Sequence, residues 1–243
     1  MSRFFILRSR YSSSNGDSCI AISGLASHPF GSWQPKGSRD GSWMWIRDAL
    51  PRAFPAIRAI LFGYDTTLLE SNSFQTIADL ASFLAENLKA SGFASPVAKP
   101  LIFLTHSLGG IVFKEMLGRE HQIIHHVVGA ILFGAPSRGM ETQALMSMVS
   151  GQPNRGLVDD LTVSSDYLQR LDDRFFEVAR RGRMELFWGY ETRTSPTVAV
   201  STDDALFVQH RLMIFVEAGR RIFCQDRTGN HPRDSRFRHS RPV

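Results

Sequence analysis

The chain has 243 residues, of which 43% are apolar and 21% charged. This length and composition suit one α/β domain and argue against a wholly disordered chain. The longest apolar stretch, residues 127–135, is far shorter than the roughly 18 residues that a membrane-spanning helix needs. Two cysteines, Cys19 and Cys224, cannot build a disulfide framework and have no neighbours for a zinc site. We therefore expect an intracellular, reducing compartment and neither a metal nor an organic cofactor.

The net charge of +5 is concentrated at the two ends of the chain. Residues 1–19 hold three arginines against one aspartate, and residues 220–243 hold seven arginines against two aspartates. The residues between them are slightly acidic, so no basic face for a nucleic acid is expected and no nucleic-acid partner is predicted. The basic, serine-rich start has the composition of a mitochondrial presequence, but it fits a frayed terminus equally well.

Short apolar runs alternate with helical patterns from residue 20 onward. This alternation predicts a mostly parallel sheet with helices on both faces. The predicted strands are residues 19–22, 57–62, 101–104, 127–133 and 184–188, and the predicted helices include residues 43–54 and 108–117. Another helix is expected to begin after an N-cap at Ser73 and to bury Ile77, Leu80, Leu84 and Leu88.

The predicted organisation has three parts. Residues 1–19 form a basic N-terminal segment suited to targeting, residues 20–219 form the folded domain, and residues 220–243 form a disordered tail. Within the domain, residues 141–182 are mostly helical and form an insertion between two strands.

The strongest chemical signal is the segment 101–110, with the sequence LIFLTHSLGG. It runs from a buried strand through Ser107 into a helix, which approximates the G-x-S-x-G nucleophile elbow. Gly109 supplies the small residue after the serine, whereas Thr105 stands where the motif has its first glycine. A helix that begins at Leu108 directs its amide dipoles toward the serine oxygen. We interpret Ser107 as a nucleophile.

Motifs spread along the chain resemble those of one known family. The matching residues are Gly24-Leu25, His28-Pro29-Phe30, Trp33, Trp45, Asp48, Leu50-Pro51, Gly63-Tyr64-Asp65, the elbow at Ser107, residues 131–139 (ILFGAPSRG) and Tyr190-Glu191-Thr192. Over residues 20–205 the chain resembles the fungal branch of the serine-active-site-containing protein family. These are lipase-like α/β-hydrolase domains, often followed by NACHT or repeat modules. The resemblance implies the α/β-hydrolase fold, serine esterase or lipase chemistry, and frequently an association with mitochondria or the endoplasmic reticulum.

A serine nucleophile needs a histidine base and an acid, which follow the serine in that fold in the order acid, then histidine. Glu191 lies just after the predicted strand 184–188 and inside the Tyr-Glu-Thr match, so we expect it to be the acid. The Asp-x-Asp-His-like motif of the family is missing. His210 follows the acid and precedes an apolar run, which makes it a better candidate base than His231 in the basic tail.

The oxyanion hole needs two backbone donors near the nucleophile. The elbow and the resemblance indicate the amides of Leu108 and Leu25. The family usually has histidine before the glycine of the second loop, where this chain has Ser23. His106, beside the nucleophile, is expected to serve packing or substrate contact. His121 and His125 are four residues apart, but no third metal ligand lies near them.

We therefore expect a serine hydrolase that cleaves a carboxylic, lipid-like ester through an acyl-enzyme on Ser107. The insertion 141–182 would cover the site and supply an apolar acyl pocket. Its partners would be a small-molecule or lipid ester and, peripherally, a membrane, with a mitochondrial, endoplasmic-reticulum or cytoplasmic location. The alternative is an α/β-hydrolase scaffold that has lost its base, or whose C-terminal end is truncated or misread, and that binds or signals.

Overall fold

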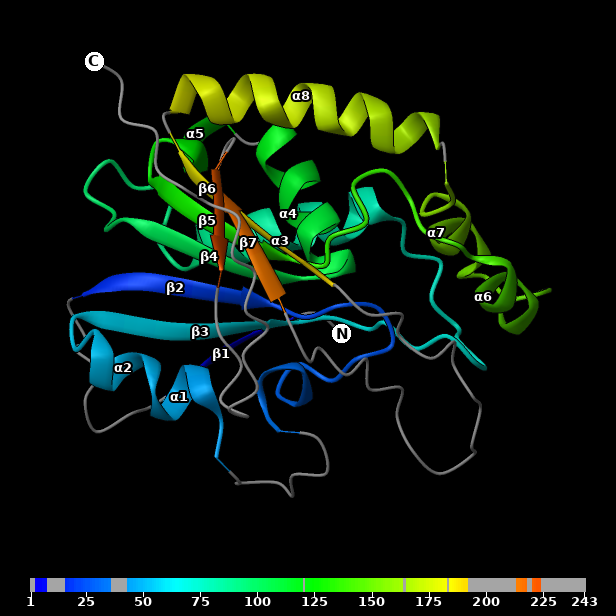
Figure 1. The fold of residues 1–243 in the computed structure, drawn as a ribbon, viewed down its shortest axis with the longest axis horizontal. Coiled ribbons are helices and arrows are strands. Elements are labelled where there is room, and N and C mark those ends of the chain that lie inside the picture. Colours follow the sequence, from blue (N-terminus) through cyan, green and yellow to red (C-terminus); the bar gives the residue numbers. More distant parts are fainter. Residues whose placement is uncertain are drawn as a thin grey trace, which may run out of the picture.

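The computed structural model of the chain contains an eight-stranded mixed sheet with helices on both faces (Figure 1). It describes residues 3–7, 16–35, 43–119, 121–163, 165–182, 184–191, 213–217 and 220–223. The order of the strands across the sheet is β1-β3-β2-β4-β5-β6-β7-β8. The strands are β1 (Arg3–Ile6), β2 (Asp17–Ile22), β3 (Ile57–Gly63), β4 (Leu101–His106), β5 (Val127–Phe133), β6 (Glu185–Glu191), β7 (Met213–Glu217) and β8 (Arg220–Phe223).

The central strands run parallel, from β3 through β2, β4 and β5 to β6. Strands β1, β7 and β8 pair antiparallel at the two edges. Ile22 at the end of β2 is level with Thr105 of β4, which is level with Leu132 of β5. The turns that follow these three strands therefore leave the sheet side by side at its carboxyl edge. The expected fold class, a mostly parallel sheet covered by helices, is confirmed.

Helices cover the two faces of the sheet unequally. Figure 1 shows α3 (Ile77–Ala90), α4 (Leu108–Arg119) and α8 (Asp166–Gly182) on one face, and α1 (Trp45–Asp48) and α2 (Leu50–Ala53) on the other. The remaining helices are the short α5 (His121–Ile124), α6 (Gln143–Met148) and α7 (Arg155–Asp159) and the 3-10 turn Gly31–Trp33.

Alternate residues of β2 belong to different cores. Ile20 and Ile22 are buried with α3 and α4, whereas Cys19 and Ala21 are buried with Ile46 of α1. This alternation is what a strand buried on both faces requires, since successive side chains point to opposite sides of the sheet.

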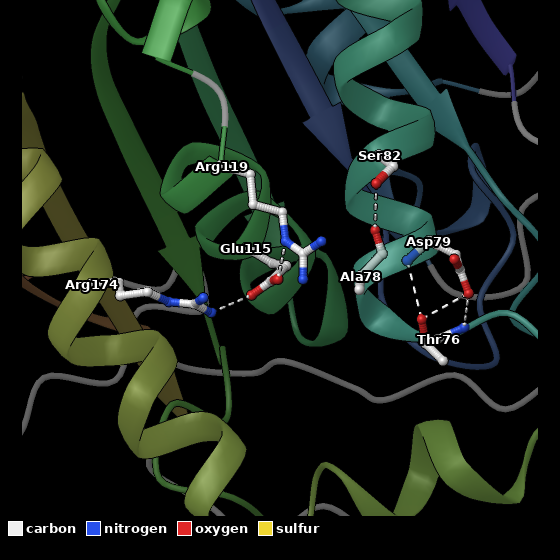
Figure 2. Close-up of polar contacts among 7 residues, drawn as sticks. All are labelled: Thr76, Ala78, Asp79, Ser82, Glu115, Arg119 and Arg174. Carbon is white, nitrogen blue, oxygen red and sulfur yellow. Dashed lines mark hydrogen bonds and ion pairs between the residues drawn. The ribbon is translucent and has the colours of Figure 1, made fainter.

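Helix α3 begins three residues later than the sequence predicts. Its N-cap is Thr76, whose hydroxyl accepts a hydrogen bond from the Asp79 amide at 3.2 Å. The Asp79 carboxylate accepts one in return from the Thr76 amide at 2.9 Å, which completes a capping box (Figure 2). The predicted N-cap, Ser73, instead accepts from the amide of Gln75 in the preceding loop. The predicted buried face is confirmed, with no exposed surface at Ile77, Leu80, Leu84 and Leu88.

Helix α8 is joined to α4 by two ion pairs of opposite polarity. The fully buried ammonium of Lys114 donates to Asp172 of α8 at 2.6 Å. The fully buried carboxylate of Glu115 accepts from Arg174 of α8 at 2.9 Å and from Arg119 of its own helix (Figure 2). Each buried charge on α4 therefore meets an opposite charge on α8, and a displacement of α8 would separate both buried charges from these partners.

The structure differs from the predicted organisation at three places. Arg3–Ile6 forms β1, which pairs with β3, so these four residues of the expected N-terminal segment belong to the sheet. Arg220–Phe223 forms β8 inside the expected disordered tail. The helix expected over residues 43–54 is divided at Ala49, since Pro51 lies in the first turn of α2 and has no amide hydrogen for a continuous helix.

None of the helices in the described ranges has both the length and the apolar character needed to cross a membrane.

Candidate active site

Ser107 occupies a strained turn between β4 and α4. Its φ angle is +50°, in the left-handed region that a non-glycine residue adopts only at a cost of about 1–3 kcal/mol. The turn is held by two backbone hydrogen bonds, from the Ser107 amide to the carbonyl oxygen of Phe133 at 2.8 Å and from the Gly110 amide to the Ser107 carbonyl at 2.9 Å. Ser107 remains partly exposed. This is the geometry of a nucleophile elbow.

Close backbone packing around Ser107 explains two glycines. A Cβ atom on Gly109 would lie 2.6 Å from the carbonyl oxygens of Ile22 and Ser23, at the end of β2. A Cβ atom on Gly24 would lie 2.7 Å from the Cβ of Ser107 and 2.8 Å from Nδ1 of His106. Neither position has room for a side chain. The absence of these two side chains brings the turn after β2 directly against the elbow.

Thr105 replaces the first glycine of the motif without disturbing the turn. It is fully buried, and its hydroxyl donates to the carbonyl oxygen of Ile131 on β5 at 3.4 Å. Gly110 leaves space for the threonine, since a Cβ atom on Gly110 would lie only 3.3 Å from the Thr105 hydroxyl. The departure from the sequence motif is therefore compatible with the elbow.

The two expected oxyanion donors belong to the two segments that adjoin Ser107, the start of α4 and the turn after β2. Leu108 is the first residue of α4, where the amides of a helix have no intrahelical acceptor. Leu25 follows Gly24, whose Cα is packed on Ser107. Within the described ranges no group accepts a hydrogen bond from either amide. Both amides are thus available to a bound oxygen atom, and their role as an oxyanion hole stays a prediction.

Glu191, the expected acid, is the last residue of β6. In the sheet, His106 at the end of β4 is level with Phe133 of β5, and Phe133 is level with Gly189 of β6. Glu191 therefore lies two residues beyond the level at which β4 ends. Ser107 and Glu191 therefore leave the sheet at the same edge, with β5 between them. The side chain of Glu191 is not among those that the structure describes, and its role stays a prediction.

His210, the expected base, and His231 lie outside the described residues. Among the residues that are described, none is hydrogen-bonded to the Ser107 hydroxyl. His106 is the nearest histidine in sequence, and its ring lies against the backbone of Gly24. This position fits the packing role expected of it.

The helical insertion divides into two parts with different positions. Helices α6 and α7 lie beyond the carboxyl ends of the strands (Figure 1), where Leu145, Val149 and Val158 are buried together with Leu68 of the loop after β3. Leu25 packs against the same cluster. Helix α8 instead returns along the face of the sheet over α4. Only the first part of the insertion is therefore beside the proposed oxyanion loop.

Lys114, which the sequence pattern did not single out, contacts the loop that follows β5. Its ammonium also donates to the hydroxyl of Ser137, in the loop after β5, at 2.5 Å. Burial lowers the pKa of Lys114, and the carboxylate of Asp172 opposes that shift. Lys114 thereby ties the loop next to the elbow to α8. In the sequence this contact is indicated only by a lysine within an apolar helix, and that pattern does not predict Ser137 and Asp172 as its partners.

In the part of the chain that is described, no three histidine, cysteine, aspartate or glutamate side chains form a group that could hold a metal ion. Within those residues His125, which lies four positions after His121, therefore belongs to no group that could bind a metal.

The chain has distant relatives among known proteins. No protein-family model matches the chain. Protein SERAC1 of Bos taurus is 27% identical over 160 residues, a match that covers 61% of this chain and 24% of the bovine protein. Protein SERAC1 of Homo sapiens is 24% identical over 197 residues, covering 71% of this chain and 30% of the human protein. The chain thus spans less than a third of the length of these curated relatives.

Two solved structures have a similar fold. The lipase BlEst2 from Bacillus licheniformis superposes with a TM-score of 0.52 at 15% identity, covering 76% of this chain and 70% of the lipase. The phospholipase PlaB from Legionella pneumophila superposes with a TM-score of 0.53 at 13% identity, covering 74% of this chain and 40% of the phospholipase. Sequence identities this low establish the fold alone. With its mostly parallel sheet, the elbow at the end of β4 and helices on both faces, the chain has the α/β-hydrolase fold of lipases and esterases.

Proposed function

We propose that this protein is a serine hydrolase that cleaves a carboxylic ester, with Ser107 as the nucleophile. The observation that carries the proposal is the left-handed backbone of Ser107, a partly exposed serine between a buried strand and the N-terminus of α4. A strained serine conformation is maintained only where the surrounding structure enforces it, and such strain is concentrated at functional sites.

In the proposed reaction, His210 accepts the proton of Ser107 as its oxygen attacks the acyl carbon, and Glu191 stabilises the resulting imidazolium. The amides of Leu25 and Leu108 donate hydrogen bonds to the oxyanion of the tetrahedral intermediate. Its collapse transfers the proton to the departing alcohol and leaves an acyl group on Ser107. Water, deprotonated by the same histidine, then releases the acid and restores the free hydroxyl.

We propose a substrate with an apolar acyl group. Met140, Met146 and Met148 are half-buried against the cluster of Leu68, Leu145, Val149 and Val158, on which Leu25 also packs. Methionine side chains adapt to flexible apolar ligands because they are unbranched and polarizable. The solved structures named a lipase and a phospholipase also agree with a lipid ester. A series of p-nitrophenyl esters should therefore show higher kcat/KM for medium or long acyl chains than for acetate.

The resemblance to the serine-active-site-containing proteins extends the proposal to location and domain context. It favours association with mitochondria or the endoplasmic reticulum, peripheral contact with a membrane, and membership of the fungal branch that precedes NACHT or repeat modules. Fractionation of cells that express the full-length protein with a C-terminal tag would test the location. Recovery in the cytosolic fraction alone would contradict it.

The central experiment is labelling with a fluorophosphonate probe, which forms a covalent bond with an activated serine. The wild-type protein should be labelled, and Ser107→Ala should not. Ser147→Ala is the matched control, since Ser147 is an exposed serine on α6 whose hydroxyl donates to the carbonyl oxygen of Gln143 in its own helix. His210→Ala should abolish labelling, and Glu191→Ala should slow it.

The outcomes separate the enzyme from the scaffold. If a folded wild-type sample is not labelled, the proposed chemistry is wrong and a binding or signalling scaffold remains. If labelling depends on Ser107 but survives His210→Ala, the hydrolase stands and the base is another residue, for which His231→Ala is the next variant.

A further inference from the structure

The turn after β2 is fastened to the turn after β3 by hydrogen bonds. The phenolic hydroxyl of Tyr64 donates to the carbonyl oxygen of Ser23 at 2.6 Å. The carbonyl oxygen of Thr66 accepts from the amide of Ala26 at 3.0 Å, and the Thr66 hydroxyl accepts from the amide of Ser27 at 3.2 Å. Two residues of the second turn thus hold three residues of the first.

These contacts determine which amide of the first turn is available. The amides of Ala26 and Ser27 are both consumed by Thr66, whereas that of Leu25 has no acceptor in the described part of the chain. The chain bends sharply just after Leu25, where Ala26 has a φ angle of +50°. The hydroxyl of Ser27 closes the turn by donating to the carbonyl oxygen of Gly24 at 2.7 Å.

The available amide belongs to the segment that touches the nucleophile. Leu25 directly follows Gly24, and a Cβ on Gly24 would be only 2.7 Å from the Cβ of Ser107. A small displacement of this turn would therefore change the distance from the Leu25 amide to an oxygen bound at Ser107. Stabilisation of an oxyanion depends steeply on such distances, because the donors must be in place before the charge develops.

We propose that Tyr64 and Thr66 are positioning residues of the oxyanion hole, which hold the Leu25 amide against Ser107. The inference rests on the proposed function and goes beyond it, since neither side chain touches the substrate. Tyr64 and Thr66 are both buried, which shields their hydrogen bonds from competition by water. Burial also raises the pKa of the Tyr64 phenol, which keeps its hydroxyl protonated and able to donate.

The test compares variants that remove the side-chain hydrogen bonds but keep the packing and the backbone hydrogen bond from Ala26 to the Thr66 carbonyl oxygen. Tyr64→Phe loses only the hydroxyl, and Thr66→Val replaces the hydroxyl with a methyl group of similar size. Thr66→Ser restores a hydroxyl, and Tyr167→Phe removes the hydroxyl of a half-buried tyrosine on α8 as the matched control. For each, kcat and KM are measured with a p-nitrophenyl ester, together with the thermal unfolding temperature and the affinity for an aryl boronic acid, whose tetrahedral adduct places an oxygen in the oxyanion hole.

We expect Tyr64→Phe and Thr66→Val to lower kcat by about 10- to 100-fold, somewhat less than the complete loss of an oxyanion donor. KM should remain within about twofold, because the contact strengthens only in the transition state. The boronic acid affinity should fall in parallel with kcat/KM. Thr66→Ser should retain most of the activity, and Tyr167→Phe all of it.

Two results would overturn the inference while leaving the proposed function intact. One is wild-type kcat in folded Tyr64→Phe and Thr66→Val proteins. The other is an equal loss in Thr66→Ser and Thr66→Val, which would mean that the hydroxyl is not what matters. If Tyr64→Phe does not fold, the pair of Thr66 variants decides the question. Failure of the wild-type protein to react with the fluorophosphonate would instead refute the proposed function, and this inference with it.

Discussion

Gly24→Ala is the substitution whose effect the structure defines most sharply. The new Cβ would lie 2.7 Å from the Cβ of Ser107 and 2.8 Å from Nδ1 of His106. Carbon atoms in contact prefer a separation of about 3.5–4.0 Å, so the turn or the elbow must move by about 1 Å. A displacement of about 1 Å at reacting groups costs about 100-fold in rate, and overpacking a close contact costs about 1–3 kcal/mol of stability.

The assay is the second-order rate constant of fluorophosphonate labelling, measured beside urea-induced unfolding. Gly24→Ala should slow labelling by about 100-fold and reduce the free energy of unfolding by about 1–3 kcal/mol. The control is Gly156→Ala in α7, an exposed glycine where an added Cβ would have no atom within 4 Å. It should leave labelling unchanged and stabilise the protein by up to about 1 kcal/mol, because alanine favours the helix.

Wild-type labelling by Gly24→Ala, at unchanged stability, would refute the reasoning. It would mean that the turn after β2 can move away from Ser107 without consequence, and that the close approach of the two turns is not needed for reactivity.

Other predictions concern the stability of the helices. Thr76→Ala should reduce the free energy of unfolding by about 1 kcal/mol, since it removes the N-cap of α3, whereas Ser82→Ala in the same helix should change it by less than about 0.5 kcal/mol (Figure 2). The Thr76 amide lowers the pKa of Asp79, so the Asp79 charge stabilises the fold above pH 3.8 and this stabilisation is lost as the pH falls through the lower folded pKa. The destabilisation by Asp79→Asn should accordingly be present at neutral pH and shrink in acid; a difference that grows in acid would contradict it. Arg174→Ala should cost about 1–3 kcal/mol in urea unfolding because it leaves the buried Glu115 with one partner fewer, whereas Glu115→Met should change stability by less than about 1 kcal/mol. A larger loss in Glu115→Met than in Arg174→Ala would contradict this account.

The alternation of apolar runs and helical patterns was enough to predict the sheet, because a strand buried on both faces has to be apolar along its whole length. Strand β5 was predicted at its observed bounds, Val127–Phe133, and β2, β3 and β4 nearly so. The elbow at Ser107 was also predictable, since a strand, a serine with a small neighbour and a helix in direct succession leave few conformations for the turn. Local information determined these features.

The cap of α3 was misjudged although the deciding residue lies only three positions after the true cap. Ser73 and Thr76 are both good N-cap residues, and the choice depends on Asp79, which can return the hydrogen bond only to Thr76. The bounds of the sheet were also misjudged at both ends, where β1 and β8 occur in arginine-rich segments whose composition does not predict strands. Pairing with a neighbouring strand supplies what their own sequences lack.

The sequence by itself determined the fold class and the elbow at Ser107, because both depend on residues that are neighbours along the chain. Only the tertiary structure decided what surrounds Ser107. Gly24, in the turn after β2, lies against the Ser107 Cβ, and Tyr64 and Thr66 form hydrogen bonds with that turn. In the loop after β5, the hydroxyl of Ser137 accepts a hydrogen bond from the buried Lys114. Each of these contacts joins residues at least 23 positions apart in the chain. The physical reason is that a parallel sheet brings the ends of distant strands to one edge, and no local pattern records which side chains then meet there.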